Sequence, residues 1–175
     1  MRVILDNLLM LGHTEDGRIR CAPLATDVGE LLHQISSEAR VTDKHHRSIE
    51  VNCTPSDLRA KVDPQLVRHI VGNLLTNACK YSPDGQPVQL DAVVREHSIE
   101  LSVTDHGIGI PPEDQSRLFS FFFRARNVGG IPGSGLGLLV VKRCVEAHHG
   151  SIALTSALGQ GTRFTVTLPL HPLSS

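Results

Sequence analysis

The segment Asp63-Pro-Gln-Leu-Val-Arg-His-Ile-Val-Gly-Asn73-Leu-Leu-Thr-Asn77-Ala-Cys-Lys80-Tyr81 predicts the central helix of this chain. Asp63 can accept hydrogen bonds from the first free N–H groups of a helix, and Pro64 suits the first helical position. Residues 82–85, Ser-Pro-Asp-Gly, predict its end. With about 3.6 residues per turn, one stripe is apolar and should pack on a sheet. That stripe comprises Val67, Val71, Leu74 and Ala78.

A polar edge lies beside the apolar stripe. Asn73, Asn77 and Lys80 fall within about 60° of one another around the helix axis. An asparagine side-chain oxygen can bind Mg²⁺, and a lysine ammonium supplies a point charge to phosphate. The edge therefore suits a metal–phosphate group, although a partly exposed polar edge without a ligand explains this helix alone equally well.

Hydrophobic periodicity and turn residues predict the remaining elements. The predicted helices are Asp27 to Glu38, with Thr26 as N-cap, and Leu136 to His148. The predicted strands are Ser48 to Cys53 and Leu58 to Val62 around a turn at 54–57, then Val88 to Arg95, Ile99 to Asp105, Ser151 to Thr155 and Thr162 to Leu168. Residues 106–135 are expected to form a long functional loop. Together these elements predict an α/β (α+β) two-layer sandwich, a mixed β-sheet with helices packed on one face.

Asp105 stands out in the strand pattern. Apolar residues alternate with polar ones from Ile99 to Thr104, and Asp105 falls in phase with the apolar set. Its carboxylate should therefore point toward the buried side, where it needs hydrogen-bond donors. Gly107 and Gly109 follow it and let the backbone pass close to a bound group. An aspartate that merely begins a glycine-rich turn is the simpler alternative.

Gly133, Gly135 and Gly137 stand at the start of a predicted helix. Without β-carbons, they leave backbone N–H groups accessible to phosphate oxygens at the positive end of the helix. The segment is not a Walker A loop, because no Gly-Lys-Ser/Thr ends it, and no βαβ unit makes it a Rossmann turn. A flexible loop before a helix would also explain the glycines.

Four of the five phenylalanines lie close together in the predicted loop. They are Phe119, Phe121, Phe122 and Phe123. Apolar rings in a mobile loop would be exposed whenever the loop opens. A lid that closes over a ligand, or docks on a partner domain, would account for them.

Composition excludes several classes of protein. The chain has 175 residues, is 40% hydrophobic and carries a formal net charge of -1, so it can bury a core, and nothing points to nucleic acid. No apolar run approaches the roughly 18 residues that a membrane-spanning helix needs. The four cysteines have no closely spaced ligand pairs and are expected to be reduced, mostly packed thiols in a cytoplasmic protein.

Four blocks taken together resemble the N box, the first glycine box, the F box and the second glycine box of the catalytic ATP-binding domain of bacterial sensor histidine kinases. They are residues 73–81, 105–111, 118–124 and 133–138. The resemblance covers nearly the whole chain and implies membership of the GHKL superfamily, a Bergerat-type fold and a long ATP lid. It also implies that residues 1–20 are the end of a dimerisation and phosphoacceptor helix with its linker, and that residues 21–175 are the catalytic domain.

The resemblance implies a role for individual residues. Asn77 would be the Mg²⁺ ligand, Asn73 and Lys80 would contact phosphate, and Asp105 would accept a hydrogen bond from the adenine amine of ATP. The catalytic set is Asn73, Asn77 and Lys80. The full set expected at the nucleotide is Asn73, Asn77, Lys80, Tyr81, Asp105, Gly107, Gly109, Ile110, Phe122, Gly133, Ser134, Gly135, Leu136, Gly137, Leu138 and Thr162.

The expected chemistry is phosphotransfer rather than hydrolysis. Hydrolysing members of the superfamily commonly carry a glutamate four residues before the metal-binding asparagine, whereas this chain has Asn73, whose amide cannot act as a general base. The γ-phosphate would pass to a histidine on the chain's own separate dimerisation and phosphoacceptor domain, and then to a response regulator receiver domain. No nucleic acid and no direct membrane contact are expected for this segment, although the parent protein could be membrane-anchored.

Two alternatives stay open. An anti-sigma-type Ser/Thr kinase shares the four blocks but typically keeps the glutamate. A degenerate module could bind nucleotide, or only protein partners, without kinase activity. Ser120 and Phe121 depart from the acidic residue and proline usual in the F box, and Leu139 replaces a small polar residue. These departures are the best support for the degenerate module.

Overall fold

The computed structural model describes residues 19–43, 47–83 and 85–170. Five strands form one sheet in the order β2 (Ile49–Thr54), β4 (Val88–Val94), β5 (Ser98–Asp105), β7 (Thr162–Pro169) and β6 (Ser151–Ser156). Strand β2 runs parallel to β4, and the other neighbouring pairs are antiparallel. The predicted mixed sheet is therefore confirmed.

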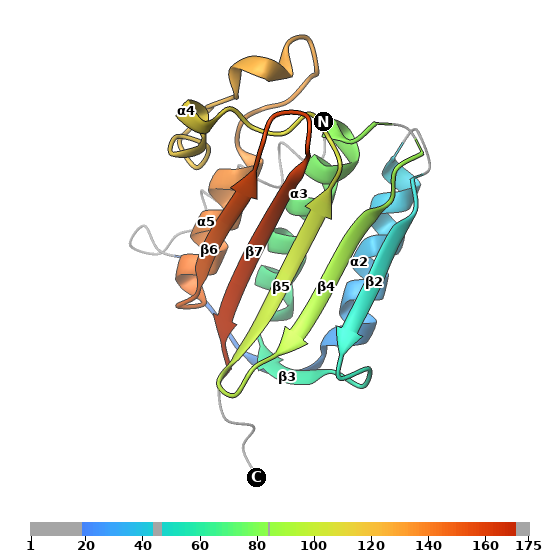
Figure 1. The fold of residues 1–175 in the computed structure, drawn as a ribbon. Coiled ribbons are helices and arrows are strands. Elements are labelled where there is room, and N and C mark those ends of the chain that lie inside the picture. Colours follow the sequence, from blue (N-terminus) through green and yellow to red (C-terminus); the bar gives the residue numbers. More distant parts are fainter. Residues whose placement is uncertain (1–18, 44–46, 84, 171–175) are drawn as a thin grey trace.

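Three helices cover one face of this sheet, as Figure 1 shows. They are α2 (Val28–Thr42), α3 (Pro64–Tyr81) and α5 (Gly137–Ala147). Helix α3 lies between the other two and contacts β5, and its apolar face is buried at Leu66, Val67, Ile70, Val71, Leu74, Leu75 and Ala78. The predicted two-layer sandwich is confirmed. None of the described helices is long and apolar enough to cross a lipid bilayer.

The predicted cap of α3 is also confirmed. The Asp63 carboxylate accepts hydrogen bonds from the N–H groups of Gln65 (2.9 Å) and Leu66 (3.1 Å). It also accepts one from the N–H of Ala22 (2.8 Å), which ties the start of the described chain to α3. The N–H of Asp63 itself donates to Nε2 of the fully buried His148, at the end of α5.

The strands expected on either side of residues 54–57 do not pair with each other. Strand β2 joins the large sheet, whereas β3 (Arg59–Val62) pairs antiparallel with β1 (Leu24–Asp27) in a separate two-stranded sheet. The pattern of β1 did not predict a strand, because it has no apolar alternation and its first residue, Leu24, is 59% exposed. This small sheet exists because the two segments satisfy each other's backbone groups.

Two boundaries of α2 differ from the prediction. Asp27, rather than Thr26, is the N-cap, because the Asp27 carboxylate accepts the N–H of Glu30 (3.0 Å). The Thr26 hydroxyl donates instead to the carbonyl of Leu24. The helix continues past Glu38 to Thr42, and Arg40 in that extra turn donates to the carbonyl of Ile49 on β2.

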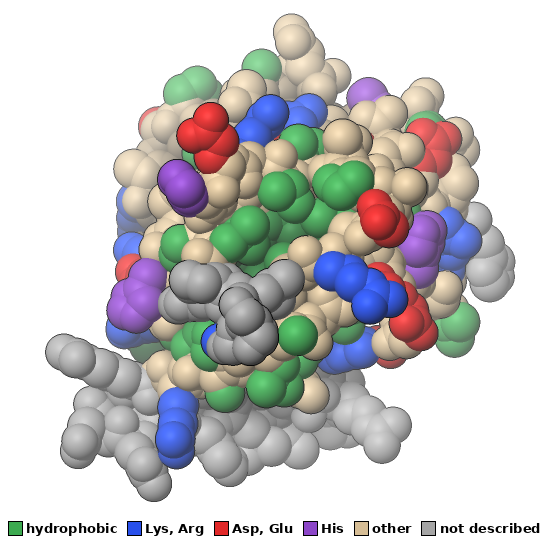
Figure 2. Space-filling model, turned by 90° about the horizontal axis from the view of Figure 1, so that it is seen from below, with side chains coloured by type: hydrophobic (Ala, Val, Ile, Leu, Met, Phe, Trp, Pro, Cys, Tyr) green, Lys and Arg blue, Asp and Glu red, His purple; other side chains and the backbone are tan. Residues whose placement is uncertain are grey.

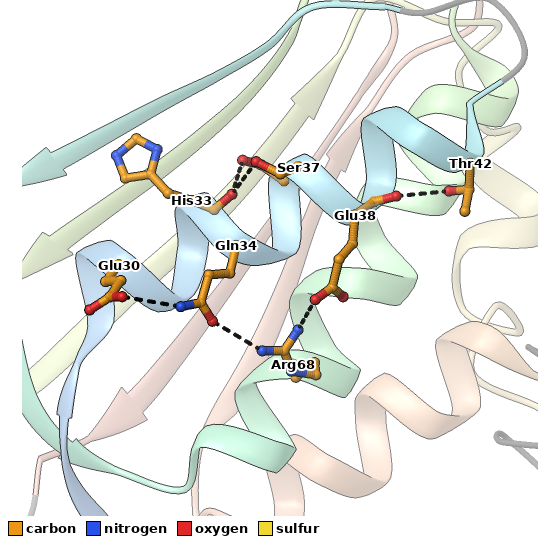
Figure 3. A network of polar contacts seen from close by, with 8 residues as sticks. Glu30, His33, Gln34, Ser37, Glu38, Thr42 and Arg68 are labelled. Carbon is orange, nitrogen blue, oxygen red and sulfur yellow. Dashed lines mark hydrogen bonds and ion pairs between the residues drawn. The ribbon is translucent and has the colours of Figure 1, made fainter.

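Polar side chains join α2 to α3 at the surface (Figure 3). Arg68 of α3 donates to Glu38 (2.8 Å) and to Gln34 (3.5 Å), and Gln34 donates to Glu30 (3.2 Å). Exposed pairs of this kind contribute at most about 1 kcal/mol. The position of α2 is therefore determined mainly by its buried face of Val28, Leu31, Leu32 and Ile35.

The two ends of the sheet differ in character. Helix α4 (Pro112–Gln115) and the loop around the 3₁₀ helix η1 (Arg126–Val128) lie at the end where β5 stops and α5 begins (Figure 1). Figure 2 shows the opposite end, where hydrophobic side chains gather in the middle of the face with charged and histidine side chains around them.

The long segment 106–135 was expected to be a loop. It contains two short helical turns, α4 and η1.

Candidate nucleotide-binding site

A cavity of about 380 Å³ opens where α3, β5, β7, the start of α5 and the loop 106–136 meet. Its size is in the range of small-molecule and cofactor sites. Most of the residues expected at the nucleotide line it. They are Asn73, Asn77, Lys80, Tyr81, Asp105, Gly109, Ile110, Gly133, Ser134, Gly135, Gly137, Leu138 and Thr162. Leu118, Phe123 and Arg124 of the block 118–124 line it as well, so four separated sequence blocks converge on one cavity.

Three expected residues lie outside the lining, each for a physical reason. A β-carbon at Gly107 would lie 2.3 Å from the carbonyl oxygen of Tyr81, so this residue packs against the end of α3. Leu136 is 1% exposed and packs in the interior just before α5. Phe122 has a positive φ of 54° and is 67% exposed, so its side chain faces solvent. Gly107 and Leu136 therefore pack behind the cavity lining, and Phe122 lies on the outer surface of the loop.

The sequence analysis did not include the apolar wall of the cavity in the set expected at the nucleotide, although it named Phe123 in the phenylalanine cluster. The wall comprises Ile108, Leu118, Phe123, Val128 and Phe164. Phe164 belongs to the apolar alternation of β7, and that alternation indicates a buried side chain but not one at a ligand site. In the loop no period indicates which apolar side chains face inward. Ligand sites are generally lined by apolar and aromatic side chains, and a wall of this kind suits a flat aromatic ring.

The carboxylate of Asp105 is the buried polar group at the apolar wall. As the alternation predicted, it points inward, and it is 7% exposed. Burial raises its pKa above the ordinary value, while hydrogen bonds from the backbone N–H groups of Gly107 and Thr162 and the nearby His106 act in the opposite direction. The bond from Gly107 is 2.7 Å long. A carboxylate has about four acceptor positions, so Asp105 can accept a further donor from a ligand in the cavity.

Lys80 and Asn73 define the polar end of the cavity. A β-carbon at Gly133 would lie 2.3 Å from Nζ of Lys80, and one at Gly137 would lie 3.0 Å from Oδ1 of Asn73. The ammonium lies 4.8 Å from the ring centroid of Tyr81. The glycines thus let the second glycine-rich segment approach both polar side chains closely. This end offers an ammonium and amide oxygens to a phosphate chain with its metal.

Helix α5 begins at this polar end. No side chain caps its first turn, and Leu136, the N-cap residue, offers only an apolar side chain. The free N–H groups and the helix dipole at such a start favour an anion. Among residues 19–43, 47–83 and 85–170, no group of three His, Cys, Asp or Glu side chains could hold a metal. A cation here would be held by amide oxygens such as that of Asn77, by water and by phosphate, which is the ligand set Mg²⁺ prefers.

Side-chain hydrogen bonds hold the segment 106–135 in place, and two of them involve Asp114 and Asn127. The carboxylate of Asp114, 1% exposed on α4, accepts the N–H of Arg126 (2.8 Å). The side chain of Asn127 donates to the carbonyl of Gly109 (2.8 Å). Between Asp114 and Asn127 the rings of Phe121 and Phe122 are exposed, whereas Phe123 lines the cavity. Phe119 is partly buried and packs against the core. The four phenylalanines therefore divide into an exposed pair, one ring at the cavity and one ring at the core.

Comparison with known families agrees with this geometry. A family model described as Histidine kinase-, DNA gyrase B-, and HSP90-like ATPase matches residues 62–172, well over half of the chain. The chain belongs to this ATPase family. The resemblance inferred from the four sequence blocks is thereby confirmed.

The ATPase domain is similar to sensor histidine kinases. It is 41% identical over 149 residues to the sensor-like histidine kinase SenX3 of Mycobacterium tuberculosis, covering 82% of this chain and 35% of that protein. It is 32% identical over 176 residues to the sensor histidine kinase CusS of Escherichia coli, covering 97% of this chain and 35% of that protein. The chain thus spans about a third of the length of these relatives.

Solved structures have the same fold. The mycobacterial sensor histidine kinase MprB matches with a TM-score of 0.75 and 30% identity over 87% of this chain and 100% of that chain. Full-length ShkA matches with a TM-score of 0.83 over 99% of this chain and 36% of that chain. Since ShkA is only 23% identical, it supports the fold of the ATPase domain alone.

Proposed function

We propose that this chain is the catalytic domain of a two-component sensor histidine kinase. It binds Mg·ATP and transfers the γ-phosphate to a histidine on a separate helical dimerisation domain, for relay to a response regulator receiver domain. One observation carries the proposal. A single cavity combines a buried carboxylate beside an apolar wall with an ammonium, amide oxygens and an uncapped helix start at its other end.

Each end of the cavity has its own task in this proposal. Asp105 accepts the exocyclic amine of the base, and the apolar wall excludes water from the base. Lys80 and the start of α5 orient the phosphate chain, and Asn77 holds the metal. Bound Mg²⁺ neutralises charge on the phosphates, and catalysis then consists of positioning and electrostatic stabilisation. The protein's part is to hold the terminal phosphate facing the acceptor histidine.

Asn73 favours transfer over hydrolysis. Its amide nitrogen donates to the carbonyl of His69 (2.8 Å), one turn earlier in α3. An amide oxygen has no useful basicity at neutral pH, so it cannot activate a water molecule. With no general base at this position, the phosphate is kept for the partner histidine.

The relatives support the proposal. SenX3 and CusS are named as sensor histidine kinases, and the ShkA structure is described as a complex with AMPPNP, an ATP analogue. A degenerate module is less well supported, because Leu139 is a buried side chain of α5 and is only 5% exposed. That departure from the family pattern has a packing explanation and does not face the cavity.

Thermal unfolding with increasing ATP or ADP, with and without Mg²⁺, tests the proposal. A ligand that binds only the folded state raises the unfolding midpoint. We expect a rise that depends on Mg²⁺. Asp105→Asn and Asn77→Asp should each weaken ATP binding by about tenfold or more, because each alters a charged or metal contact. Glu96→Gln removes a charge on an exposed turn and should bind ATP like the wild type.

Transfer is tested separately from binding. The chain is mixed with radiolabelled ATP and a separately supplied phosphoacceptor domain of a related sensor kinase. Label on the acceptor histidine supports the kinase. ATP binding without transfer to any such domain would favour the degenerate module, and wild-type ATP affinity in both variants would refute the site.

A further inference from the structure

Ser156, at the end of β6, connects the strands beneath the cavity to the turn that follows Asp105. Its hydroxyl oxygen accepts a hydrogen bond from the N–H of Ile110 (2.9 Å), and its O–H donates one to the carbonyl of Gly161 (2.9 Å). It also lies 2.9 Å from the hydroxyl oxygen of Thr162. Ser156 itself does not line the cavity, whereas Thr162 does.

The protons of this cluster can be assigned by counting. A serine hydroxyl has one proton and two lone pairs. The carbonyl of Gly161 can only accept, so it takes the Ser156 proton, and one lone pair accepts the N–H of Ile110. The contact between Ser156 and Thr162 is then a hydrogen bond only if Thr162 donates. The proton of Thr162 therefore points toward Ser156, which does not line the cavity, and the Thr162 oxygen is left as an acceptor.

Asp105 and Thr162 face each other across β5 and β7 and both line the cavity. Asp105 is a buried carboxylate that already accepts two backbone N–H groups. With Thr162 also an acceptor, these two side chains present only acceptors to a ligand. A ligand that places a hydrogen-bond donor beside Asp105 and Thr162 is therefore favoured. A ligand that places a carbonyl there is disfavoured, because its oxygen would meet the acceptor oxygens of both residues.

Close backbone contacts hold the turn after Ser156 against the turn that follows Asp105. The N–H of Gly159, in the turn between β6 and β7, donates to the carbonyl of Ile108 (2.9 Å). A β-carbon at Gly109 would lie 2.0 Å from the carbonyl oxygen of Ala157. The side-chain amide of Gln115 on α4 donates to the carbonyls of both Ile110 and Ser156. The two turns therefore behave as one unit with Ser156 at its centre.

We propose that Ser156 is a positioning residue that fixes Thr162 as a hydrogen-bond acceptor, so that the cavity selects a purine with an exocyclic amine over one with a carbonyl at the same ring position. The inference rests on the proposed nucleotide-binding function. Ser156 touches no ligand and acts through the orientation of the Thr162 hydroxyl. Without it, Thr162 can rotate and donate to a carbonyl.

ATP and inosine triphosphate form the matched pair for the test, because they differ at this ring position by an amine and a carbonyl. The dissociation constants of both, with Mg²⁺, are measured for the wild type and variants. Ser156→Ala should lower the preference for ATP over inosine triphosphate by about 5- to 10-fold, the effect of one hydrogen bond. Ser156→Cys, which keeps the shape but bonds weakly, should do the same. Ser156→Thr, which keeps a hydroxyl, should retain the preference.

Thr155→Ala is the control on the same strand, since Thr155 is exposed and adjacent in sequence. It should leave the ratio unchanged. If the alanine and cysteine variants weaken both nucleotides equally, Ser156 has only a structural role and the inference is overturned, while the proposed function stands. If the wild type binds neither nucleotide, the proposed function fails first, and this inference fails with it.

Discussion

At the scale of single residues, two glycines of one turn are held by different constraints. Gly161 has a φ of +83°, and a β-carbon there would lie 2.0 Å from the carbonyl oxygen of Asp105. Gly159 has a φ of +71°, but a β-carbon there would meet nothing within 4 Å. Both positions favour glycine by backbone conformation, and only Gly161 also by close packing.

Replacing each glycine with alanine separates the two causes. Gly159→Ala should cost about 1 kcal/mol of folding free energy, the strain of a left-handed conformation. Gly161→Ala should cost roughly 3 kcal/mol or more, because the backbone beneath Asp105 must also move. It should also weaken ATP binding, whereas Gly159→Ala should not. Urea unfolding and ATP titration measure the two effects, and equal costs would show that packing at Gly161 is not a constraint.

At the scale of elements, α3 depends on a single carboxylate at its start. Asp63 is 6% exposed and accepts three backbone N–H groups, two from the first turn of α3 and one from Ala22. Its own N–H is satisfied by His148 at the end of α5. The same residue therefore caps one helix, anchors the chain before β1 and links α3 to α5.

Substitution of Asp63 should reveal these separate bonds. Asp63→Ala leaves three buried or partly buried donors without an acceptor and should lower the free energy of unfolding by about 2–4 kcal/mol. Asp63→Asn keeps one acceptor oxygen and should lose about half as much. Asp57→Ala, in an exposed turn, is the control and should be nearly neutral. Denaturant unfolding measures the free energy of unfolding of each variant. An equal loss of stability in the alanine and asparagine variants would contradict the role of Asp63 as a helix cap.

At the scale of the whole molecule, one continuous core joins the helices to the sheet. Two thiols are part of it, Cys79 of α3 and Cys144 of α5. Burial raises the pKa of Cys79 from 9.0 to about 11. The charges of Asp43 and Asp105 raise this pKa further, and the charge of Arg47 lowers it. Burial also raises the pKa of Cys144 from 9.0 to about 12, with a smaller contribution from Asp63. Both thiols are packed and free, as expected from the sequence.

These pKa values predict that stability is lost at alkaline pH. Above pH 9.0 the thiols ionise in the unfolded chain but stay protonated in the folded one up to about pH 11 and about pH 12. The unfolded state then binds fewer protons, so the free energy of unfolding falls by about 1.4 kcal/mol per pH unit per thiol. Below pH 9 the two thiols contribute no pH dependence.

The Cys79→Ala, Cys144→Ala double variant isolates this effect. Its cavities lower stability by the same amount at every pH, so only the slope above pH 9 reports the thiols. We expect urea unfolding between pH 7.5 and 10.5 to give a shallower alkaline decline in the variant than in the wild type. Parallel curves would show that the thiols ionise equally in both states.

Much of the fold and part of the site followed from sequence alone. The extent and cap of α3, the inward position of Asp105 and the strands of the mixed sheet were predicted correctly, because each rests on local periodicity or on a neighbouring residue. Residues 1–18, most of the segment assigned to the end of a dimerisation helix and its linker, lie outside the described residues, so the assignment of residues 1–20 stays a prediction.

Tertiary structure decided the rest. It separated β3 from β2, turned Phe123 into the cavity and Phe122 away from it, and brought Ser156 beneath Thr162. None of these follows from a period of 2 or 3.6 residues, because each depends on backbone groups that find partners far away in sequence. The sequence determined which chemical groups are available. Only the packing of distant segments decided which of them share one cavity and which hydroxyl groups contact each other beside it.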